Sequence, residues 1–580
     1  MATTARDPTN TEIAAALDEL GDLYELDGAV IHRIVAYRNA AKAIREAPVS
    51  VAALAREGRA TELAGVGATI QEKVIALSTE GEIPALVKLK AKFPPGLVEM
   101  TRLPGLGPKR ARRLFDELGI DSPEKLRTAA SEQRIRVLKG FGPKAEESIL
   151  AALAVAGAGE HGRRVVLDRA LAVADALIPA LREHPAAERV ELAGSARRWV
   201  DSVKDLDVIA TGTDPGALAR AAAQLELVET AGSVSDSGVR LRTHTGIAVD
   251  LRIVAPDQFG NLLQHLTGSK EHNMALRDMA VRKGLHVSEY GVLDDSTEET
   301  HRCPTEQQVY ALLGLEYIEP ELRENRGELE AAAAGTLPEL IELGDLRGDL
   351  HCHTTASDGT ASIEEMAAAA REAGYEYLAI TDHSATMGFG ADLSPERLRE
   401  QIERIRAIEV DGLQLLAGSE VNILPDGSLD YDDELLAELD WVIASVHSSF
   451  RTPSEQMTER IVRAIEHPLV DAIGHPSGRK IERRPPYQFD LERVVEAATR
   501  TGTMLEINSS PDRRDLNDTS ARAAAAAGVA IVINCDAHRV RGFEVARYGI
   551  GTARRAWLTA RDVANTKPWS ELEALRPRNR

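Results

Sequence analysis

The most constraining feature of this sequence is a regular alternation of apolar runs and helical patterns through residues 346–580. Seven runs have the length and composition of strands: LRGDLH, YLAIT, LQLLAGSE, WVIASVH, VDAIGH, TMLEIN and AIVINCDAH. Strands that alternate with helices form parallel sheets, because each helical crossover returns the chain to the same edge. We therefore predict that this part of the chain folds as a distorted (β/α)7 barrel.

Metal-ligating residue types stand at the ends of these runs. Of fifteen histidines, seven lie from position 351 onward, and six of those fall at a strand end. Strand ends of a barrel meet at one mouth, so these side chains can converge there. Imidazoles and carboxylates without thiolates suit Mn²⁺, Zn²⁺ or Fe²⁺, and a set of this size can hold two or three ions that clamp and hydrolyse a phosphoester. The candidate ligands are His351, His353, Asp358, His383, Glu420, His447, His475, Asp536 and His538.

The first 156 residues have a different pattern, in which short helical stretches are broken by Gly or Pro. One phrase occurs three times, at residues 63–77, 103–118 and 138–150, as an apolar residue, a Gly-x-Gly turn and a helix start. Glycine permits positive φ, and the amides at a helix N-terminus bind anions, so each phrase predicts a phosphate-binding helix-hairpin-helix. The expected phosphate contacts are Gly65, Gly67, Gly105, Gly107, Lys109, Gly140, Gly142 and Lys144.

Charge is distributed unevenly along the chain. The formal net charge of −22 argues against a nucleic-acid partner, but residues 88–150 hold fourteen Lys or Arg against eight Asp or Glu, a balance of +6. The basic window is where we expect a DNA backbone to bind. Arg479, Lys480, Arg483 and Arg484 form a second basic run, which either guides DNA phosphates or is an ordinary solvated surface.

Residues 163–254 alternate strands with Ala-rich helices and carry a second group of acids. Asp205 and Asp207 lie on one face of a strand because side chains alternate with period two, and a later strand brings Asp250. Three converging carboxylates repel one another unless divalent cations such as Mg²⁺ or Mn²⁺ neutralise them, which is the arrangement of two-metal phosphoryl transfer. Upstream, Gly194 and Ser195 can approach phosphate oxygens, and Arg198 adds a charged donor.

The remaining features limit the class of protein. The sequence has no apolar run of eighteen residues and no secretory signal, so we expect a cytoplasmic protein that does not contact a membrane. Three scattered cysteines argue against a disulfide framework or a thiolate zinc site. Residues 317–345 are acidic, Ala-rich and broken by Pro, and are predicted to be a connector.

The Gly-Ser-x-Arg-Arg and Asp-x-Asp motifs, with the VDLR phrase, resemble the X-family of DNA polymerases. The phrase LTGSKEHNMALR at 266–277 looks like the thumb segment of that family. The resemblance implies that Gly268, Lys270, Asn273 and Arg277 contact the nucleotide or template. It also places Lys73 at the position of the family's sugar-phosphate lyase nucleophile, for which phosphate binding is the alternative role.

The His and Asp motifs of residues 346–575 resemble the PHP (polymerase and histidinol phosphatase) domain. An X-family polymerase followed by a PHP domain is typical of bacterial members, and this order implies gap-filling synthesis with dNTPs on gapped or primer-template DNA, together with a metal-dependent 3′→5′ exonuclease. Asp382, Glu506 and Asn508 are left as residues that support the ligands, and we expect a monomer. The expected domains are 1–85 (N-terminal helical), 86–158 (helix-hairpin-helix fingers), 159–258 (nucleotidyltransferase palm), 259–316 (thumb), 317–345 (connector) and 346–580 (PHP).

Two alternatives stay open at this point. The barrel can instead hydrolyse a small phosphate ester, and the first half of the chain then only delivers this substrate. Alternatively, the palm can be an inactive DNA-binding scaffold, although Asp205, Asp207 and Asp250 are all present.

Overall fold

The computed structural model describes residues 7–101, 103, 106–156, 164–386 and 393–579. The chain forms two compact units that interleave along the sequence. Among the described residues, the first unit holds those up to 156 together with 172–191 and 204–254. The second holds 164–171, 192–203 and everything from 255 onward. No described helix is both long enough and apolar enough to cross a membrane.

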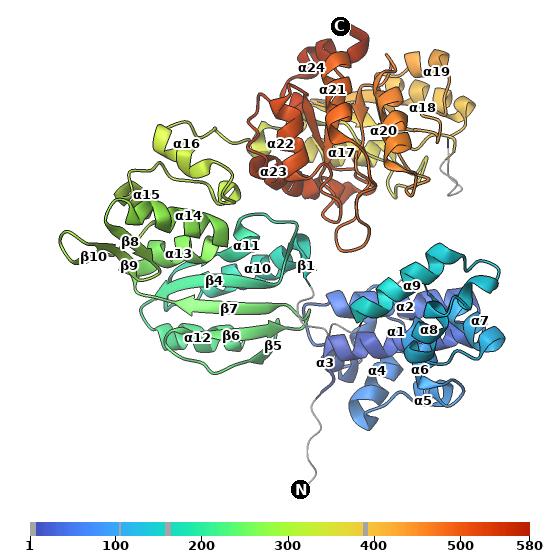
Figure 1. The fold of residues 1–580 in the computed structure, drawn as a ribbon, viewed down its shortest axis with the longest axis horizontal. Coiled ribbons are helices and arrows are strands. Elements are labelled where there is room, and N and C mark those ends of the chain that lie inside the picture. The colour runs from blue at the N-terminus through green and yellow to red at the C-terminus, as the bar shows by residue number, and fades with distance from the viewer. Residues whose placement is uncertain (1–6, 102, 104–105, 157–163, 387–392, 580) are drawn as a thin grey trace. The chain divides into compact units, whose positions relative to one another are not determined.

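The N-terminal part is helical, as the sequence predicts (Figure 1). Its apolar faces form one core, which extends from Ile13 to Leu153. Its described helices are α1 (Asn10–Leu26), α2 (Ile31–Glu46), α3 (Val51–Arg56), η1 (Ala60–Glu62), α4 (Ala68–Glu80), α5 (Pro84–Lys90), α6 (Pro95–Thr101), α7 (Pro108–Leu118), α8 (Pro123–Ser131), η2 (Ile135–Val137) and α9 (Pro143–Ala156).

The three predicted hairpin turns lead into α4, α7 and α9. Gly65 and Gly140 have φ of +87° and +90°, the left-handed region that L side chains rarely adopt. A Cβ atom at Gly67, Gly107 or Gly142 would meet nothing within 4 Å. These second glycines are therefore not required by internal packing, and the backbone before each helix is open to a ligand. Gly105 lies outside the described residues.

The palm sheet has the strand order β2-β4-β7-β6-β5. Strand β4 (Asp205–Gly212) runs parallel to β7 (Ala248–Ile253), whereas β6 (Gly238–Thr243) is antiparallel to both β7 and β5 (Val228–Ala231). In β4, Leu206 is buried between exposed Asp205 and half-buried Asp207, and the next four residues, 208–211, are all buried. The other described elements are β1 (Val165–Val166), α10 (Leu167–Arg182), β2 (Ala187–Leu192), α11 (Gly194–Arg197), β3 (Ser202–Val203) and α12 (Pro215–Ala223).

The thumb combines helices with a three-stranded antiparallel sheet in the order β10-β9-β8. Residues 317–345, expected to be a connector, contribute Ile318, Leu322, Leu329 and Leu340 to the thumb core. The described elements are η3 (Pro256–Gln258), α13 (Phe259–Thr267), α14 (Lys270–Val281), β8 (Leu285–Ser288), β9 (Gly291–Asp294), β10 (Glu299–His301), α15 (Glu306–Leu312), η4 (Pro320–Leu322), α16 (Glu328–Ala334) and η5 (Leu343–Asp345).

The C-terminal part confirms the predicted barrel (Figure 1). In its described residues, seven parallel strands follow one another in sequence order, and a bridge between Cys352 and Ala537, just beyond the first and last strands, nearly closes them. The strands are β11 (Gly348–Asp349), β12 (Tyr377–Ile380), β13 (Gln414–Asn422), β14 (Trp441–Ser445), β15 (Ala472–Ile473), β16 (Met504–Asn508) and β17 (Ile531–Asn534). The helices are α17 (Ile363–Glu372), α18 (Pro395–Ala407), α19 (Asp433–Ala437), α20 (Ser454–Ile465), α21 (Leu491–Thr501), α22 (Asp518–Ala526), η6 (Val540–Val545), α23 (Ala546–Arg555), η7 (Ala564–Thr566), α24 (Trp569–Leu575) and η8 (Pro577–Asn579).

Alternation along the barrel strands separates two cores. Tyr377 and Ala379 of β12 face a cluster that also contains Trp441 and Met504 and is packed against α24. Leu378 and Ile380 face a larger cluster beneath the surrounding helices. Both faces of the strands are thus buried, and the ligand-bearing residues are left at the strand ends.

Candidate active sites

The three palm carboxylates occupy adjacent positions on neighbouring parallel strands. The register pairs Asp207 on β4 directly with Asp250 on β7, and Asp205 lies two residues earlier on the same face of β4. Asp205 is exposed, and the other two are half-buried. Arg240 and Arg252 approach Asp250 to 3.7 and 3.9 Å. The structure therefore brings the predicted acids to one face of the sheet.

The predicted Gly-Ser turn opens α11, and Gly194 has φ of +67°. Arg198, which we expected at the nucleotide, is engaged within the second unit. Its Nε lies 3.0 Å from Glu324 Oε1, and its Nη1 donates to the carbonyl of Thr267 at 2.5 Å. A Cβ atom on Gly268 would lie 3.3 Å from Nη1 of Arg198, so the turn and the thumb segment are neighbours.

Three other predicted nucleotide residues lie on α14. Asn273 is held by two contacts, since its Nδ2 donates to the carbonyl of His265 at 2.7 Å and its Oδ1 accepts from Gln264 at 2.9 Å. Arg277 is exposed and its Nη2 lies 3.1 Å from Nδ1 of the same histidine. Lys270 is exposed at the first position of the helix.

The lysines predicted in the N-terminal helices follow the hairpin turns. Lys73 on α4 is half-buried, and its Nζ lies 5.7 Å from the ring centroid of Tyr37 and 3.3 Å from the carbonyl of Thr69. Lys109 is exposed in the first turn of α7, and Lys144 follows the first residue of α9.

The predicted barrel ligands come together at the C-terminal ends of the strands. His351 and His353 follow β11, His383 follows β12, and Glu420 lies near the end of β13. The remaining ligands follow later strands and the first loop: His447 after β14, His475 after β15, Asp536 and His538 after β17, and Asp358 in the loop after β11.

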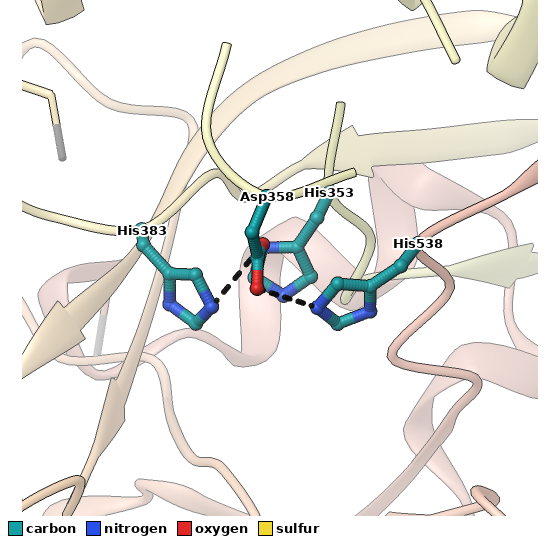
Figure 2. A group of neighbouring side chains, drawn as sticks. All are labelled: His353, Asp358, His383 and His538. Carbon is teal, nitrogen blue, oxygen red and sulfur yellow. Dashed lines mark ion pairs between the residues drawn. The ribbon is translucent and has the colours of Figure 1, made fainter. Parts of the chain in front are cut away.

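These side chains form three overlapping groups, and within each the ligand atoms lie within 4.8 Å of one another. Figure 2 shows the group in which Asp358 lies between His383 and His538, at 3.5 and 3.3 Å, with the ring of His353 beside it. The other two groups are His351, His353 and Asp536, and His383, Glu420 and His447.

Glu420 is the central carboxylate of the barrel site. Its oxygens lie 2.8 Å from His383 Nδ1, 3.0 Å from His447 Nε2 and 2.9 Å from His475 Nε2. His475 belongs to none of the three groups but joins the site through this contact. All nine predicted ligands are therefore in one continuous cluster.

The electrostatics of the cluster keep its carboxylates ionised. Burial by itself raises the pKa of Glu420, but His447, His351 and His383 outweigh it and hold that pKa well below its usual range. The pKa of Asp536 is lowered in the same way, against burial, chiefly by His351. Ionised carboxylates are the form that binds a cation.

The imidazoles divide into two kinds. Burial, assisted by His383, lowers the pKa of His353 to about 4, and burial also lowers the pKa of His475 to about 4. Burial disfavours charge on His383 as well, but Glu420 and Asp358 raise its pKa to about 10. The field at this histidine favours positive charge, which a divalent cation would supply in place of a proton.

The donor set fits divalent metal ions. His351 Nε2, His353 Nδ1 and His475 Nδ1 are buried imidazole nitrogens that have no hydrogen-bond partner among the described residues. Burying such atoms without a partner is unfavourable, and coordination would satisfy them. Among the described residues, the three groups contain only His, Asp and Glu, so the ligand atoms that they offer are nitrogen and oxygen.

Two acids noted as supporting residues in the sequence hold these ligands. Glu506 accepts from His351 Nδ1 at 2.8 Å and from the backbone amide of His475 at 2.6 Å. Asp382 accepts from the backbone amide and hydroxyl of Thr354 and from Ser357, so it fixes the loop that carries Asp358. Asn508 donates to Asp536 at 3.0 Å.

Sequence reasoning missed one support, Asn422, whose Oδ1 lies 2.6 Å from Nδ1 of His447. The only available signal was its place two residues after Glu420 on the same strand face.

In the basic run after His475, two of the four side chains form ion pairs. Arg479 pairs with Asp201 at 2.6 Å, and Lys480 pairs with Asp512 at 2.9 Å.

Comparisons with known proteins agree with these sites. Models of four families match: the DNA polymerase beta thumb over residues 262–324, the PHP domain over 349–510, a helix-hairpin-helix domain over 8–83 and a SAM-like helix-hairpin-helix tandem over 97–154.

Curated relatives match the whole chain or the barrel. The DNA polymerase/3′-5′ exonuclease PolX of Bacillus subtilis (strain 168) is 38% identical over 572 residues, which cover 98% of this chain and 99% of the relative. A probable phosphatase of Thermoanaerobacter sp. (strain X514) is 34% identical over 249 residues, 40% of this chain and 95% of the relative. One of Shewanella oneidensis is 36% identical over 200 residues, 33% of this chain and 75% of the relative. The identity to PolX over nearly the full length of both proteins shows that this chain belongs to the PolX family of DNA polymerases with a PHP domain.

Proposed function

We propose that this protein is a DNA polymerase that adds deoxynucleotides to primer 3′ ends in short gaps during DNA repair. The observation that carries the proposal is the register of the palm sheet, which pairs Asp207 with Asp250 and places Asp205 on the same face. The full-length similarity to PolX supports the same activity.

Asp205, Asp207 and Asp250 would hold two Mg²⁺ or Mn²⁺ ions. Bound there, the ions would lower the pKa of the primer 3′ hydroxyl and neutralise charge on the triphosphate. The amide of Gly194 and the hydroxyl of Ser195 would bind phosphate oxygens.

Residues on and next to α14 would also contact the nucleotide or template. Lys270 and Arg277 are exposed cations that would contact phosphate or template, and Asn273 and Gly268 would border the nucleotide. Arg198 would reach a phosphate only by exchanging its present partners, Glu324 and the carbonyl of Thr267.

The hairpin turns would hold DNA phosphates through the open backbone at Gly67, Gly107 and Gly142 and through Lys109. The lyase role of Lys73, the monomeric state and the cytoplasmic location stay predictions.

The barrel would be a metal-dependent 3′→5′ exonuclease. Its nine ligands would hold two or three Mn²⁺, Zn²⁺ or Fe²⁺ ions, which would supply a hydroxide at neutral pH and stabilise the leaving 3′ oxygen. The protein's own part is to keep Glu420 and Asp536 ionised and to orient His351 through Glu506.

The test is primer extension on a gapped duplex with Mg²⁺ or Mn²⁺. Asp205→Ala and Asp207→Ala should each abolish extension while leaving 3′-end degradation unchanged, and His353→Ala should do the reverse. If a folded Asp207→Ala protein lost both activities together, the assignment of separate sites would be wrong.

A second candidate for the barrel is hydrolysis of a small phosphate ester. The similarity of the barrel to proteins named probable phosphatases favours it. Comparing kcat/KM for a primer 3′ end with kcat/KM for histidinol phosphate would decide, because the better substrate identifies the activity.

A further inference from the structure

The segment that follows the Gly194–Ser195 turn contacts the barrel. Within the second unit, residues 197–202, here called the palm loop, are held by arginines that come from the barrel. Arg514 Nη2 donates to the carbonyl of Trp199 at 2.8 Å, and Arg555 Nη1 donates to the carbonyl of Arg198 at 2.8 Å. Two successive carbonyls of the loop are thus fixed by barrel side chains.

A buried charge cluster fixes the next part of the palm loop. Arg514 has no exposed side-chain surface, its Nε donates to Thr552 at 2.8 Å, and its Nη1 lies 3.4 Å from Asp201. Arg479 Nη1 approaches the other oxygen of Asp201 at 2.6 Å. A buried guanidinium is strongly destabilising without partners, so the loop must occupy this position for Arg514 to be satisfied.

Shape complementarity adds to the charges. Trp199 has φ of +57° and its ring packs edge-on against Tyr548 of α23, with ring centroids 5.9 Å apart. A Cβ atom on Gly551 would lie 2.5 Å from the indole of Trp199, closer than atoms can pack. The surface of α23 therefore fits this tryptophan because residue 551 is a glycine.

The palm loop is also tied to the thumb. Glu324 accepts from Arg198 Nε at 3.0 Å and from Arg555 Nη1 at 2.8 Å, so one carboxylate joins the loop, the thumb and the barrel. Arg197 Nη2 lies 2.7 Å from Glu306 of α15. The Gly194–Ser195 turn and Arg197, the first residue of the palm loop, belong to the same short helix, α11 (Gly194–Arg197). The contacts of the palm loop therefore begin two residues after Ser195.

We infer that Arg479, Arg514 and Arg555 are positioning residues for nucleotide addition: by fixing the palm loop, the barrel sets the conformation of the Gly194–Ser195 turn. The inference rests on the proposed role of that turn in binding the triphosphate. The barrel is then a structural part of the nucleotide site, in addition to carrying its own metal centre.

The experiment uses the full chain and steady-state primer extension with varied dNTP. Asp201→Asn and Arg479→Gln, singly and together, test the contact from its two sides. We expect each to raise KM for dNTP about three- to tenfold with kcat within twofold. The double variant should be no worse than the larger single effect, because either substitution already removes the contact between Asp201 and Arg479. The 3′→5′ exonuclease of Asp201→Asn should stay within twofold of wild type.

Two further variants distinguish failure of the positioning role from failure of the proposed role of the turn. Arg493→Gln removes an exposed ion pair with Glu455 on the barrel and should leave KM unchanged. Ser195→Ala should raise KM if the turn binds the nucleotide. Suppose that Ser195→Ala raises KM but the Asp201 and Arg479 variants do not, or that the effects of these two variants add or fall on kcat alone. The positioning role is then refuted, while the proposed role of the turn in binding the nucleotide stands. If Ser195→Ala leaves KM unchanged, the role of the turn and this inference both fail.

Discussion

Glu306 in α15 is the acceptor for two guanidinium groups in the thumb core, and replacing it by Gln should destabilise this region strongly. Its Oε1 lies 2.5 Å from Nη1 of Arg323, and its Oε2 lies 2.7 Å from Nη2 of Arg197. Arg323 is fully buried, and its Nη2 has no hydrogen-bond partner among the described residues. Glu306→Gln would leave that cation without its carboxylate.

The magnitude follows from the pKa of Glu306. Burial by itself would raise this pKa, but Arg323 and Arg197 outweigh burial and lower it from 4.5 to about 2. A difference of this size corresponds to about 3 kcal/mol at neutral pH, and breaking a buried ion pair typically costs about 3–5 kcal/mol. Because the folded pKa is depressed, the stabilisation is fully present above pH 4.5 and is lost as pH falls through 2.

Hydrogen exchange measured by mass spectrometry on peptides spanning residues 306–324 reports the local free energy of opening. At pH 7, Glu306→Gln should lower protection there about a hundredfold or more, whereas exposed Glu330, replaced by Gln, should change nothing. At pH 3 the difference between wild type and variant should shrink to roughly half. Equal protection at pH 7, or a difference that does not vary with pH, would refute this account of the ion pair.

Three other predictions concern the candidate sites. Asp382→Asn weakens the support of the loop that bears Asp358 and should lower the affinity of the barrel for metal about 10- to 100-fold, while leaving nucleotide addition intact. Titration calorimetry measures this affinity, and an unchanged value would contradict the role of Asp382. After the metals are removed by chelation, Mg²⁺ alone should restore nucleotide addition at the carboxylate site, whereas the exonuclease should need Mn²⁺, Zn²⁺ or Fe²⁺. Equal recovery of both activities with Mg²⁺ would argue against two kinds of metal site. Lys109→Ala should reduce the slope of log affinity for DNA against log salt by about one, and an unchanged slope would show that this lysine contacts no phosphate.

The barrel site was predictable from the sequence because its ligands are tied to strand ends. Once the strand-like runs are in phase, the fold itself brings His351, Glu420 and Asp536 together, whatever their separation along the chain. Strand lengths were less predictable. The runs LRGDLH and VDAIGH pair with their neighbouring strands only over Gly348–Asp349 and Ala472–Ile473.

The segment 317–345 illustrates what composition does not reveal. Its acidic, Ala-rich character is that of a solvated linker, yet Glu328 is fully buried with its Oε1 2.7 Å from Nδ1 of His272, and Arg323 is buried against Glu306. The partners lie 56 and 17 residues away, and no local pattern links them. Charge in a sequence indicates exposure only when no complementary charge is available to bury with it.

The palm loop extends this argument to function. Gly194 and Ser195 were recognisable from a local motif, because a phosphate-binding turn needs specific residues in a row. The side chains that hold the loop come from residues 479, 514 and 555. The sequence singled out only Arg479, as part of a basic run, and did not indicate that any of the three is buried against the loop. The structure shows this burial: Arg514 is inaccessible, and burial lowers its pKa to about 10 even though Asp201 opposes the shift. An arginine kept in so unfavourable an environment, with a backbone carbonyl of the palm loop as its acceptor, is explained by the position that it imposes on that loop.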